Sequence, residues 1–311
     1  MHCNEICDGA QSFPQNTNKK SKVKLSKLQR SIQQVFIFSE NDLKIFESHV
    51  DTIVEQGRNG VLKEFTVDHT LLRQKYFFGE RYTYGAQSSK RGLGTEKLYP
   101  ENSVDQIPKW IINGIINPLV AAEIIPENFV NSVVINDYMP GGCIVSHIDP
   151  PQIFDRPIVS LNLFSDSALC FGCKFKYKPL RCSQPLMKLN MPRGITTSLS
   201  GFAANGITHC VRPEDVTQRR AVIMLRRVHP SAPRLLPMES YVGLKRIHNN
   251  NVNINGSSVI MSAEYFRKCY LTLQKYWRCH NKFGRIFKRC DRRKLSFRNT
   301  RYYAVGSYII N

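Results

Sequence analysis

The residues best suited to chemistry are His147 and Asp149, which stand two positions apart in the segment CIVSHID. Successive side chains of a strand point to opposite faces, so residues two apart share one face. A neutral imidazole and a carboxylate that meet at one point suit a ferrous ion if a second imidazole completes the set. Alone, a His-x-Asp pair is more often a surface or hydrogen-bonded pair, so the pattern needs support from elsewhere in the chain.

His209, in the segment GITHCVRP, is the candidate for the second imidazole. It follows Asp149 by sixty positions, and a jelly roll returns to its opposite sheet over about that distance. Taken by itself, His209 is better explained as a hydrogen-bonded core histidine. The other six histidines lie in no comparable context.

Two arginines frame a third element, the segment RAVIMLR from Arg220 to Arg226. The pattern predicts a strand on which both arginines project from one face and the apolar residues from the other. Burying guanidinium groups is costly unless an anion accompanies them, and a dicarboxylate would be gripped well by an arginine fork. The alternative is that the two arginines flank an apolar strand at its solvated ends.

Asn136 and Tyr138 lie two apart on a predicted strand that precedes the turn 139–142. If this turn forms a hairpin, their shared face is the face of His147 and Asp149. An amide and a phenol hydroxyl can orient a small oxo-acid. The tripeptide alone is also compatible with an ordinary edge strand.

The segment 73–97 mixes positive charges with aromatic rings. It carries a net charge of +4, and we expect Tyr82 and Tyr84 to be accessible. Basic groups can follow a phosphodiester backbone while a ring stacks on an unpaired base. The alternative is a solvated loop with its aromatic triplet 76–78 in the core, and we expect both descriptions to hold for different residues. The charged residues are Arg73, Lys75, Arg81, Lys90, Arg91 and Lys97, with Glu80 and Glu96.

Short β-branched and aromatic runs separated by Gly and Pro fill residues 129–228. They predict a mainly β fold, an antiparallel sandwich or jelly roll. A flanking helix is expected to begin at the N-cap Ser39 and to end near Gly57 and Gly60. A second is expected over 108–125, kinked or broken at Pro118.

The net charge of +20 is concentrated at the two ends of the chain. Residues 1–34 carry +4 and residues 234–311 carry +13, whereas the segment between them carries +3. We therefore expect a disordered basic arm over 1–34, a folded domain over 35–235 and a poorly ordered basic tail over 236–311. A hydrophobic content of 42% excludes wholesale disorder, and the charge favours an anionic partner.

The N-terminal segment has no apolar stretch typical of a secretory signal, and no run approaches the roughly 20 apolar residues of a membrane span. We expect an intracellular monomer without membrane insertion, with most of its ten cysteines reduced. The run 288–294 is typical of a nuclear import signal or a non-specific RNA contact, and residues 263–287 of a basic amphipathic helix. The location that we expect is the nucleus.

Taken together, Asn-x-Tyr, His-x-Asp, a distal His and Arg-x5-Arg occur in the order found in the AlkB family of iron(II)- and 2-oxoglutarate-dependent dioxygenases. The chain resembles this family over about residues 35–235. The stretches LLRQKYFFGERYTYGAQ and FSDSALCFGCKFKYKP extend the resemblance toward members that demethylate N6-methyladenosine in RNA. The fold that it implies is a double-stranded β-helix, or jelly roll, with buttressing helices.

The resemblance also implies roles for single residues. The positions that match the iron ligands are His147, Asp149 and His209. Those that match contacts of the cosubstrate 2-oxoglutarate are Lys75, Asn136, Tyr138 and Arg220. Those that match substrate-binding positions are Arg73, Tyr84 and Arg226, and Tyr82 on the same recognition loop is the catalytic candidate.

Cys170 and Cys173 form a single Cys-x-x-Cys pair, and the lack of a second pair argues against structural zinc. On a strand the two would face opposite ways. The resemblance implies a disulfide between Cys173 and Cys210 that narrows the substrate opening, although such a bridge is unusual inside a cell.

The function implied is oxidative demethylation of N6-methyladenosine in single-stranded RNA, with release of formaldehyde, succinate and carbon dioxide. Two alternatives stay open. One is the same chemistry on alkylated DNA or a protein side chain. The other is a metal-free jelly roll that only binds RNA, against which the full set of ligand types and both arginines argue.

Overall fold

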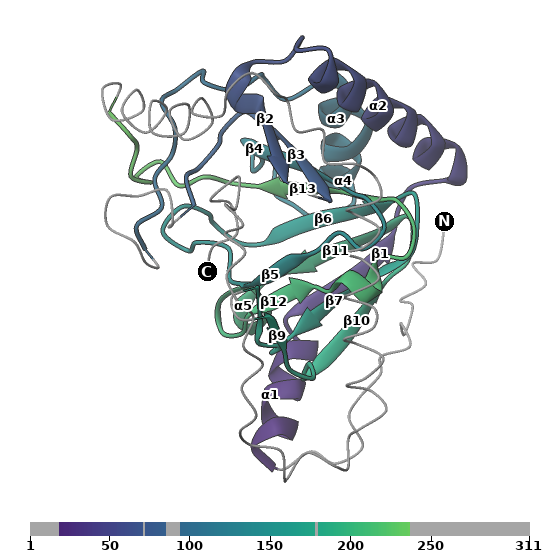
Figure 1. Cartoon of the computed structure of the whole chain (residues 1–311), viewed down its shortest axis with the longest axis vertical. Helices are drawn as coiled ribbons and strands as arrows, with labels where there is room; N and C mark the ends of the chain where they lie inside the picture. The colour runs from purple at the N-terminus through teal and green to yellow at the C-terminus, as the bar shows by residue number, and fades with distance from the viewer. Residues whose placement is uncertain (1–18, 71, 85–93, 178–179, 237–311) are drawn as a thin grey trace, which may run out of the picture. The chain divides into compact units, whose positions relative to one another are not determined.

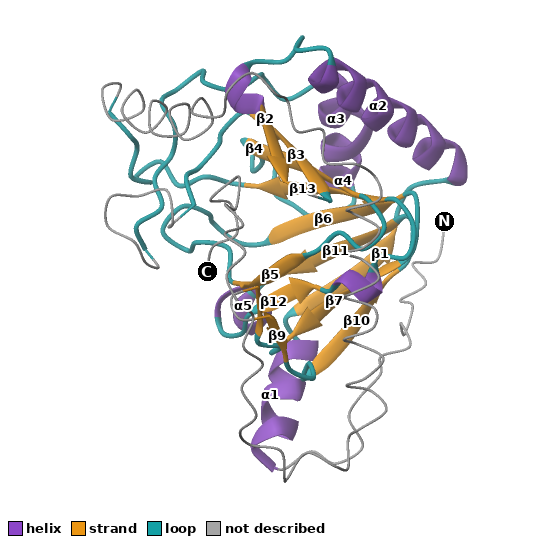
Figure 2. Cartoon of the chain, in the orientation of Figure 1, coloured by secondary structure: helices purple, strands orange, loops and turns teal. Residues whose placement is uncertain are grey.

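A computed structural model describes residues 19–70, 72–84, 94–177 and 180–236, all within one compact unit. The described part is mainly antiparallel β structure, with two principal sheets and a few helices (Figures 1 and 2). The predicted class, a mainly β jelly roll with flanking helices, is confirmed.

The larger sheet has seven strands in the order β1-β11-β6-β13-β4-β3-β2, and every pairing in it is antiparallel. Neighbouring strands are far apart in the sequence, so long-range pairing decides which side chains meet. The strands are β1 (Ile32–Phe36), β2 (Val67–Thr70), β3 (Arg73–Phe78), β4 (Ser132–Tyr138), β6 (Ile158–Leu163), β11 (Ile195–Leu199) and β13 (Arg220–Arg226).

The smaller sheet has four strands in the order β10-β7-β12-β5, and a separate two-stranded hairpin pairs β8 with β9. These strands are β5 (Ile144–His147), β7 (Ser167–Phe171), β8 (Phe175–Tyr177), β9 (Leu180–Cys182), β10 (Met187–Met191) and β12 (His209–Val211).

Helices cover one face of the larger sheet (Figure 1). The apolar stripe of α2 (Glu40–Arg58) packs on the face of β4, β6 and β13 that carries Ile135, Leu161 and Ile223. Ser39 caps this helix as predicted, in a reciprocal capping box with Asp42. The opposite face of these strands therefore carries the polar residues.

The second flanking helix differs from the prediction. It is divided into α3 (Lys109–Ile111), the π-type turn η2 (Ile112–Ile116) and α4 (Asn117–Ala121). Pro118 stands in the first turn of α4, where its missing N–H costs nothing, so the irregularity precedes the proline.

The prediction of a disordered arm over 1–34 was wrong for residues 19–34. Here α1 (Lys19–Gln29) leads into β1, because Leu25 and Leu28 share one helical face and pack beside α5 (Gly201–Asn205). Residues 1–18 and the predicted tail from residue 237 onward lie outside the described residues.

The turn 139–142 does not form the hairpin that the sequence analysis considered as a condition. β4 lies between β3 and β13 in the larger sheet, whereas β5 pairs with β12 in the smaller one. The residues 139–142 cross between the two sheets instead of joining paired strands. Every helix in the described ranges is too short or too polar to cross a bilayer.

Candidate metal centre and anion pocket

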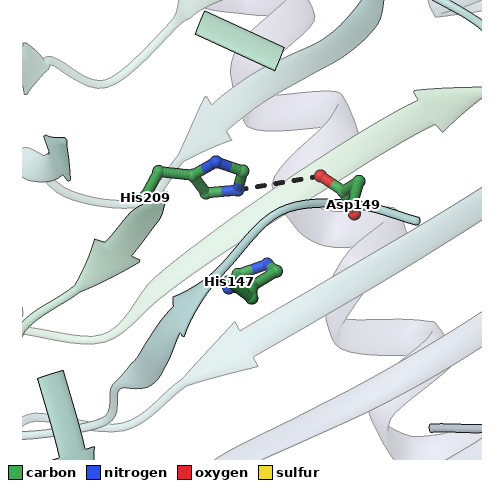
Figure 3. A group of neighbouring side chains, drawn as sticks. All are labelled: His147, Asp149 and His209. Atoms are coloured by element: carbon green, nitrogen blue, oxygen red, sulfur yellow. Dashed lines mark ion pairs between the residues drawn. The ribbon is translucent and has the colours of Figure 1, made fainter. Parts of the chain in front are cut away.

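Three potential metal ligands converge between the two sheets. One donor atom from each of His147, Asp149 and His209 lies within 4.8 Å of the other two (Figure 3). The Nε2 atom of His209 is 3.7 Å from Oδ2 of Asp149, and the two imidazole centroids are 4.5 Å apart. Two imidazoles and one carboxylate form the donor set that non-haem Fe(II) oxygenases use.

The pairing of β5 with β12 brings the imidazoles together, because His147 and His209 are direct partners in the register. Asp149 reaches them differently from the prediction. β5 ends at His147, so Asp149 lies in the loop before Pro150 and Pro151 rather than on the strand. The convergence of the three side chains was predicted correctly, but the shared strand face was not, because Asp149 reaches the cluster from a loop.

The protonation of these groups suits metal binding. Burial lowers the pKa of His147 and lowers that of His209 to about 3, so both rings are neutral and carry a lone pair. Burial alone would raise the pKa of Asp149, but His147, His209 and Arg226 outweigh it and hold the carboxyl ionised. Nδ1 of His147 lies 2.8 Å from the carbonyl oxygen of Val145, which leaves Nε2 as the donor to a metal.

A group of cationic and polar side chains, called the cationic pocket below, lies on the polar face of the larger sheet, at one end of β3, β4 and β13. Tyr138 pairs in register with both Arg73 and Arg220, and Asn136 pairs with Lys75. Residues opposite each other in neighbouring strands point to the same face, so these five side chains share one small region. Arg73 and Arg220 both lie over the Tyr138 ring, at 5.6 and 5.2 Å from its centroid.

This pocket holds more positive charge than its own residues neutralise. Arg220 is 2% exposed, and its Nε donates to Asn162 Oδ1 at 2.6 Å. Its Nη1 and the Nε and Nη1 atoms of Arg73 are buried without a hydrogen-bond partner in the described ranges. Lys75 reaches Asp68 at 3.5 Å and Tyr84, and burial together with Arg73 lowers its pKa. Buried donors without an acceptor fit an anionic ligand, and a carboxylate matches the arginine forks.

No family model matches the chain. Over 209 residues, 67% of its length, it is 56% identical to the RNA demethylase ALKBH5 of Rattus norvegicus and 55% identical to that of Xenopus tropicalis. The chain is a homologue of the ALKBH5 proteins. The matched region covers 53% and 58% of those two relatives, so the chain spans little more than half of their length.

More distant similarities were also found. The RNA demethylase ALKBH9B of Arabidopsis thaliana is 28% identical over 202 residues, 63% of this chain and 38% of that protein. Among solved structures, that of OsALKBH1 aligns with 63% of this chain and 98% of its own at 13% identity and a TM-score of 0.37.

In this ALKBH5 homologue the basic residues predicted to follow RNA from a loop are turned inward. Arg73 and Lys75 are on β3, and Arg81 donates to the carbonyl of Phe65 and lies 3.9 Å from Asp68. Internal carbonyl, carboxylate and phenol groups hold Lys75 and Arg81 in this inward position, whereas Arg73 lies over the ring of Tyr138. Residues 85–93, including Lys90 and Arg91, lie outside the described residues.

Tyr82 and Tyr84 are half-buried rather than freely accessible. Tyr82 packs edge-on against Phe154 at 5.1 Å, and Tyr84 donates to Asp68 at 3.0 Å. Arg226 is 2% exposed, lies over Phe154 at 4.0 Å and reaches Asp149 Oδ1 at 3.9 Å. These residues form a wall beside the metal ligands. The aromatic triplet 76–78 is buried, as predicted.

None of the five cysteines in the described ranges is bridged in this structure. Cys173 and Cys210 are both fully buried and in contact, and Cys210 directly follows the ligand His209. The disulfide between them stays a prediction.

Sequence reasoning missed three positioning residues: Asp68, Asn162 and Arg156. Asp68 and Asn162 hold the pocket cations Lys75 and Arg220. The Arg156 Nη2 atom donates to the carbonyl oxygen of Asp149 at 2.8 Å, and Nε donates to Asn205 Oδ1 at 2.9 Å. Asn205 ends the helix that precedes β12, the strand of His209. The Arg156 guanidinium therefore connects the loop that carries Asp149 with the segment that leads to His209. No local pattern marks these residues, because each acts on a segment far away in the sequence.

Proposed function

We propose that this ALKBH5 homologue is an Fe(II)- and 2-oxoglutarate-dependent demethylase that acts on N6-methyladenosine in single-stranded RNA. The observation that carries the proposal is the His147–Asp149–His209 cluster, with His147 half-buried and the other two buried, beside a cationic pocket with unpartnered donors. A bound ferrous ion with 2-oxoglutarate and dioxygen supplies oxidation of the N-methyl carbon, and formaldehyde, succinate and carbon dioxide are released.

His147 and His209 would hold the metal through neutral imidazoles, and Asp149 through an ionised carboxylate. The pKa of His209, lowered to about 3 by burial, keeps its lone pair available throughout the physiological range. Arg156 fixes the backbone that presents Asp149. The protein thus supplies a pre-shaped donor set whose charge is partly balanced before the metal binds.

Arg220 and Tyr138 would bind the distal carboxylate of 2-oxoglutarate, with Arg73 close by. Burial removes competing water, so charge-assisted hydrogen bonds to this carboxylate are stronger than at the surface. Asn136 and Lys75 lie side by side on neighbouring strands and would orient the rest of the cosubstrate.

Tyr82, Tyr84, Arg73 and Arg226 would contact the nucleotide. Burial raises the pKa of Tyr82 to about 12, so its phenol stays protonated and can donate a hydrogen bond. Arg226 is held between the ring of Phe154 and the carboxylate of Asp149, with Nη1 toward that carboxylate and Nη2 donating to Ser132 Oγ at 3.4 Å. A wall of aromatic rings and a guanidinium group suits an unpaired base better than a duplex.

The test is a substrate panel with the purified protein, Fe(II) and 2-oxoglutarate. It contains one sequence as N6-methyladenosine RNA, as the same DNA, as a duplex and with a 1-methyl mark, together with a methylated peptide. We expect succinate and formaldehyde in equal amounts from the single-stranded N6-methyladenosine RNA, dependent on added iron. Turnover confined to the DNA or the peptide contradicts the substrate, and absence of iron-dependent succinate contradicts the enzyme class.

We also propose a nuclear location and a monomeric state. The location is supported by the basic run 288–294, which lies outside the described residues. Fluorescence microscopy of the tagged chain, with and without substitution of this run, and sedimentation of the purified protein test the two statements.

A further inference from the structure

Tyr82 lies on a narrow pair of antiparallel segments, residues 81–84 and 97–99, called the Tyr82 ribbon below. Tyr82 lies opposite Leu98, and two backbone hydrogen bonds of 2.7 and 2.8 Å join the segments on either side of this pair. A two-stranded ribbon is marginally stable in water unless a further strand or a core supports it. The position of the Tyr82 ring therefore depends on what holds the segment opposite it.

Residues 227–235, which follow β13 and are called the strap below, supply a third strand to this ribbon. The Leu98 amide donates to the Pro233 carbonyl oxygen at 2.7 Å, and the Leu235 amide donates to the Leu98 carbonyl oxygen at 2.8 Å. Leu98 thus forms a parallel bridge with Arg234 and an antiparallel bridge with the other segment of the ribbon. The strap therefore covers one edge of the ribbon.

The Arg234 side chain joins both segments of the ribbon. Its Nη1 and Nη2 atoms donate to Oε2 and Oε1 of Glu80 at 2.9 and 2.8 Å, and Nη1 also donates to the Tyr99 carbonyl oxygen at 2.6 Å. Glu80 directly precedes the first segment, and Tyr99 ends the second. The side chains of Arg234 and Glu80 are 28% and 22% exposed, so water screens this two-point pair less than a pair on the open surface.

The strap also holds the loop that carries Asp149. The Asp155 amide donates to the Arg227 carbonyl oxygen at 2.8 Å, and the His229 amide donates to the Ile153 carbonyl oxygen at 2.9 Å. A small apolar cluster joins the strap, the loop and the ribbon. Its buried members are Leu98, Ile153, Phe154, Ile158 and Val228, and Tyr82, Met224 and Ala232 pack against them. The strap therefore connects the Tyr82 ribbon with the loop of a metal ligand.

We propose that the strap sets the position of Tyr82 for the methylated nucleotide, with Arg234 as the positioning residue. The inference rests on the proposed function, because it assigns the strap to nucleotide binding. The cationic pocket lies at the Arg220 end of β13, whereas the strap continues from the Arg226 end. Loss of the Arg234 contacts should therefore weaken the binding of RNA and leave the binding of 2-oxoglutarate unchanged.

The test compares Arg234→Gln with the wild type by amide hydrogen exchange and by steady-state kinetics. Exchange should become faster in peptides that cover the Tyr82 ribbon, because its backbone hydrogen bonds open more often. Exchange in β5 and β12, the strands of the two ligand histidines, should stay unchanged. The KM for single-stranded N6-methyladenosine RNA should rise about tenfold, whereas the KM for 2-oxoglutarate should stay unchanged.

Glu80→Gln breaks the same pair from the other side and should cause both changes. The double variant should be no worse than either single variant, because the two side chains act as one unit. Arg193→Gln is the matched control. It breaks a half-buried arginine pair with Glu40 and Glu47, and it should change neither the exchange of the ribbon nor the KM for RNA. Arg234→Lys, which keeps the charge, replaces Arg234→Gln if that variant does not fold, and smaller changes of the same kind are expected.

Unchanged exchange in the Tyr82 ribbon overturns the proposal, whatever the activity. Faster exchange with an unchanged KM for RNA overturns the assignment of the strap to nucleotide binding. Equal increases in both KM values also overturn it, because they indicate a general loss of structure. A wild-type protein that does not turn over the RNA contradicts the proposed function instead, and the exchange comparison still decides whether Arg234 holds the ribbon.

Discussion

The metal-ligand cluster and the cationic pocket lie next to each other but are built in opposite ways. The pocket is a product of sheet register, since five side chains from β3, β4 and β13 meet because their strands are hydrogen-bonded neighbours. The cluster joins a strand pair in the other sheet to a loop, and Arg156 holds the loop in place. The pocket presents arginine N–H groups that have no acceptor, whereas the cluster presents the lone pairs of two imidazoles and a carboxylate.

This difference separates what each region can bind. Buried N–H groups without an acceptor favour an anion, whereas neutral imidazoles and an ionised carboxylate favour a cation. The two regions are close enough for Arg73 and Lys75 to help lower the pKa of His147. A substitution in one region should therefore affect its own ligand strongly and the other ligand weakly.

The largest effect is expected from His209→Ala. The variant lacks one of three donors, so we expect loss of high-affinity Fe(II) or Mn(II) binding and loss of turnover. Calorimetry with Mn(II) and succinate formation measure the two quantities. His69→Ala, which alters an exposed histidine of β2, is the control and should match the wild type. Wild-type turnover by His209→Ala would refute the ligand assignment.

Arg220→Ala should weaken the binding of 2-oxoglutarate to the cationic pocket. Loss of charge-assisted hydrogen bonds worth about 1.5–3 kcal/mol predicts an increase of about 10- to 100-fold in the KM for 2-oxoglutarate. Mn(II) affinity should remain near that of the wild type. Arg219→Ala is a suitable control, because Arg219 pairs with Asp51 and Asp137 outside the pocket. An unchanged KM in Arg220→Ala would show that the cosubstrate carboxylate binds elsewhere.

Asp68→Asn tests the support of the pocket through pH. Burial alone would raise the pKa of Asp68, but Lys75, Arg81 and Tyr84 outweigh it and lower the pKa below its ordinary 3.8. The folded state thus gains stability from the ionised carboxyl above pH 3.8 and loses it as the pH falls through the lowered value. We expect the variant to be about 2 kcal/mol less stable at pH 7, with the difference disappearing toward low pH.

Urea unfolding of both proteins at a series of pH values measures this difference. Asp51→Asn removes an exposed partner of Arg219 and should cost much less. A difference that stays constant down to the acid limit would mean that the carboxyl charge of Asp68 does not stabilise the fold.

Arg156→Lys should produce the smallest effect. Lysine keeps the charge but cannot reach Asp149 O, Phe154 O and Asn205 together, so we expect Mn(II) to bind about tenfold more weakly. The KM for 2-oxoglutarate should be unchanged. Arg193→Lys alters an arginine that pairs with Glu40 and Glu47, away from the cluster, and should leave metal affinity intact. Equal metal affinity in both variants would reduce Arg156 to a general structural role.

Much of the fold was predictable from local pattern. The capping residue Ser39, the alternation along RAVIMLR and the short β runs of 129–228 all depend on neighbours within a few positions, and the structure bears them out. The helix at Lys19–Gln29 was missed because its lysines suggest a solvated arm. Its two leucines become informative only when α5 packs against them.

The sequence by itself determined which chemistry was available: two imidazoles, a carboxylate and paired arginines, at spacings that repeat every second residue or return from a distant strand. Only the tertiary structure decided that β4 joins β3 and β13 rather than β5, that Arg73 and Lys75 face inward, and that Arg156 braces Asp149. The physical reason is the distance along the sequence over which each interaction acts. Side-chain periodicity is set by the adjacent residues, whereas strand pairing and buried hydrogen bonds join residues that no local pattern relates.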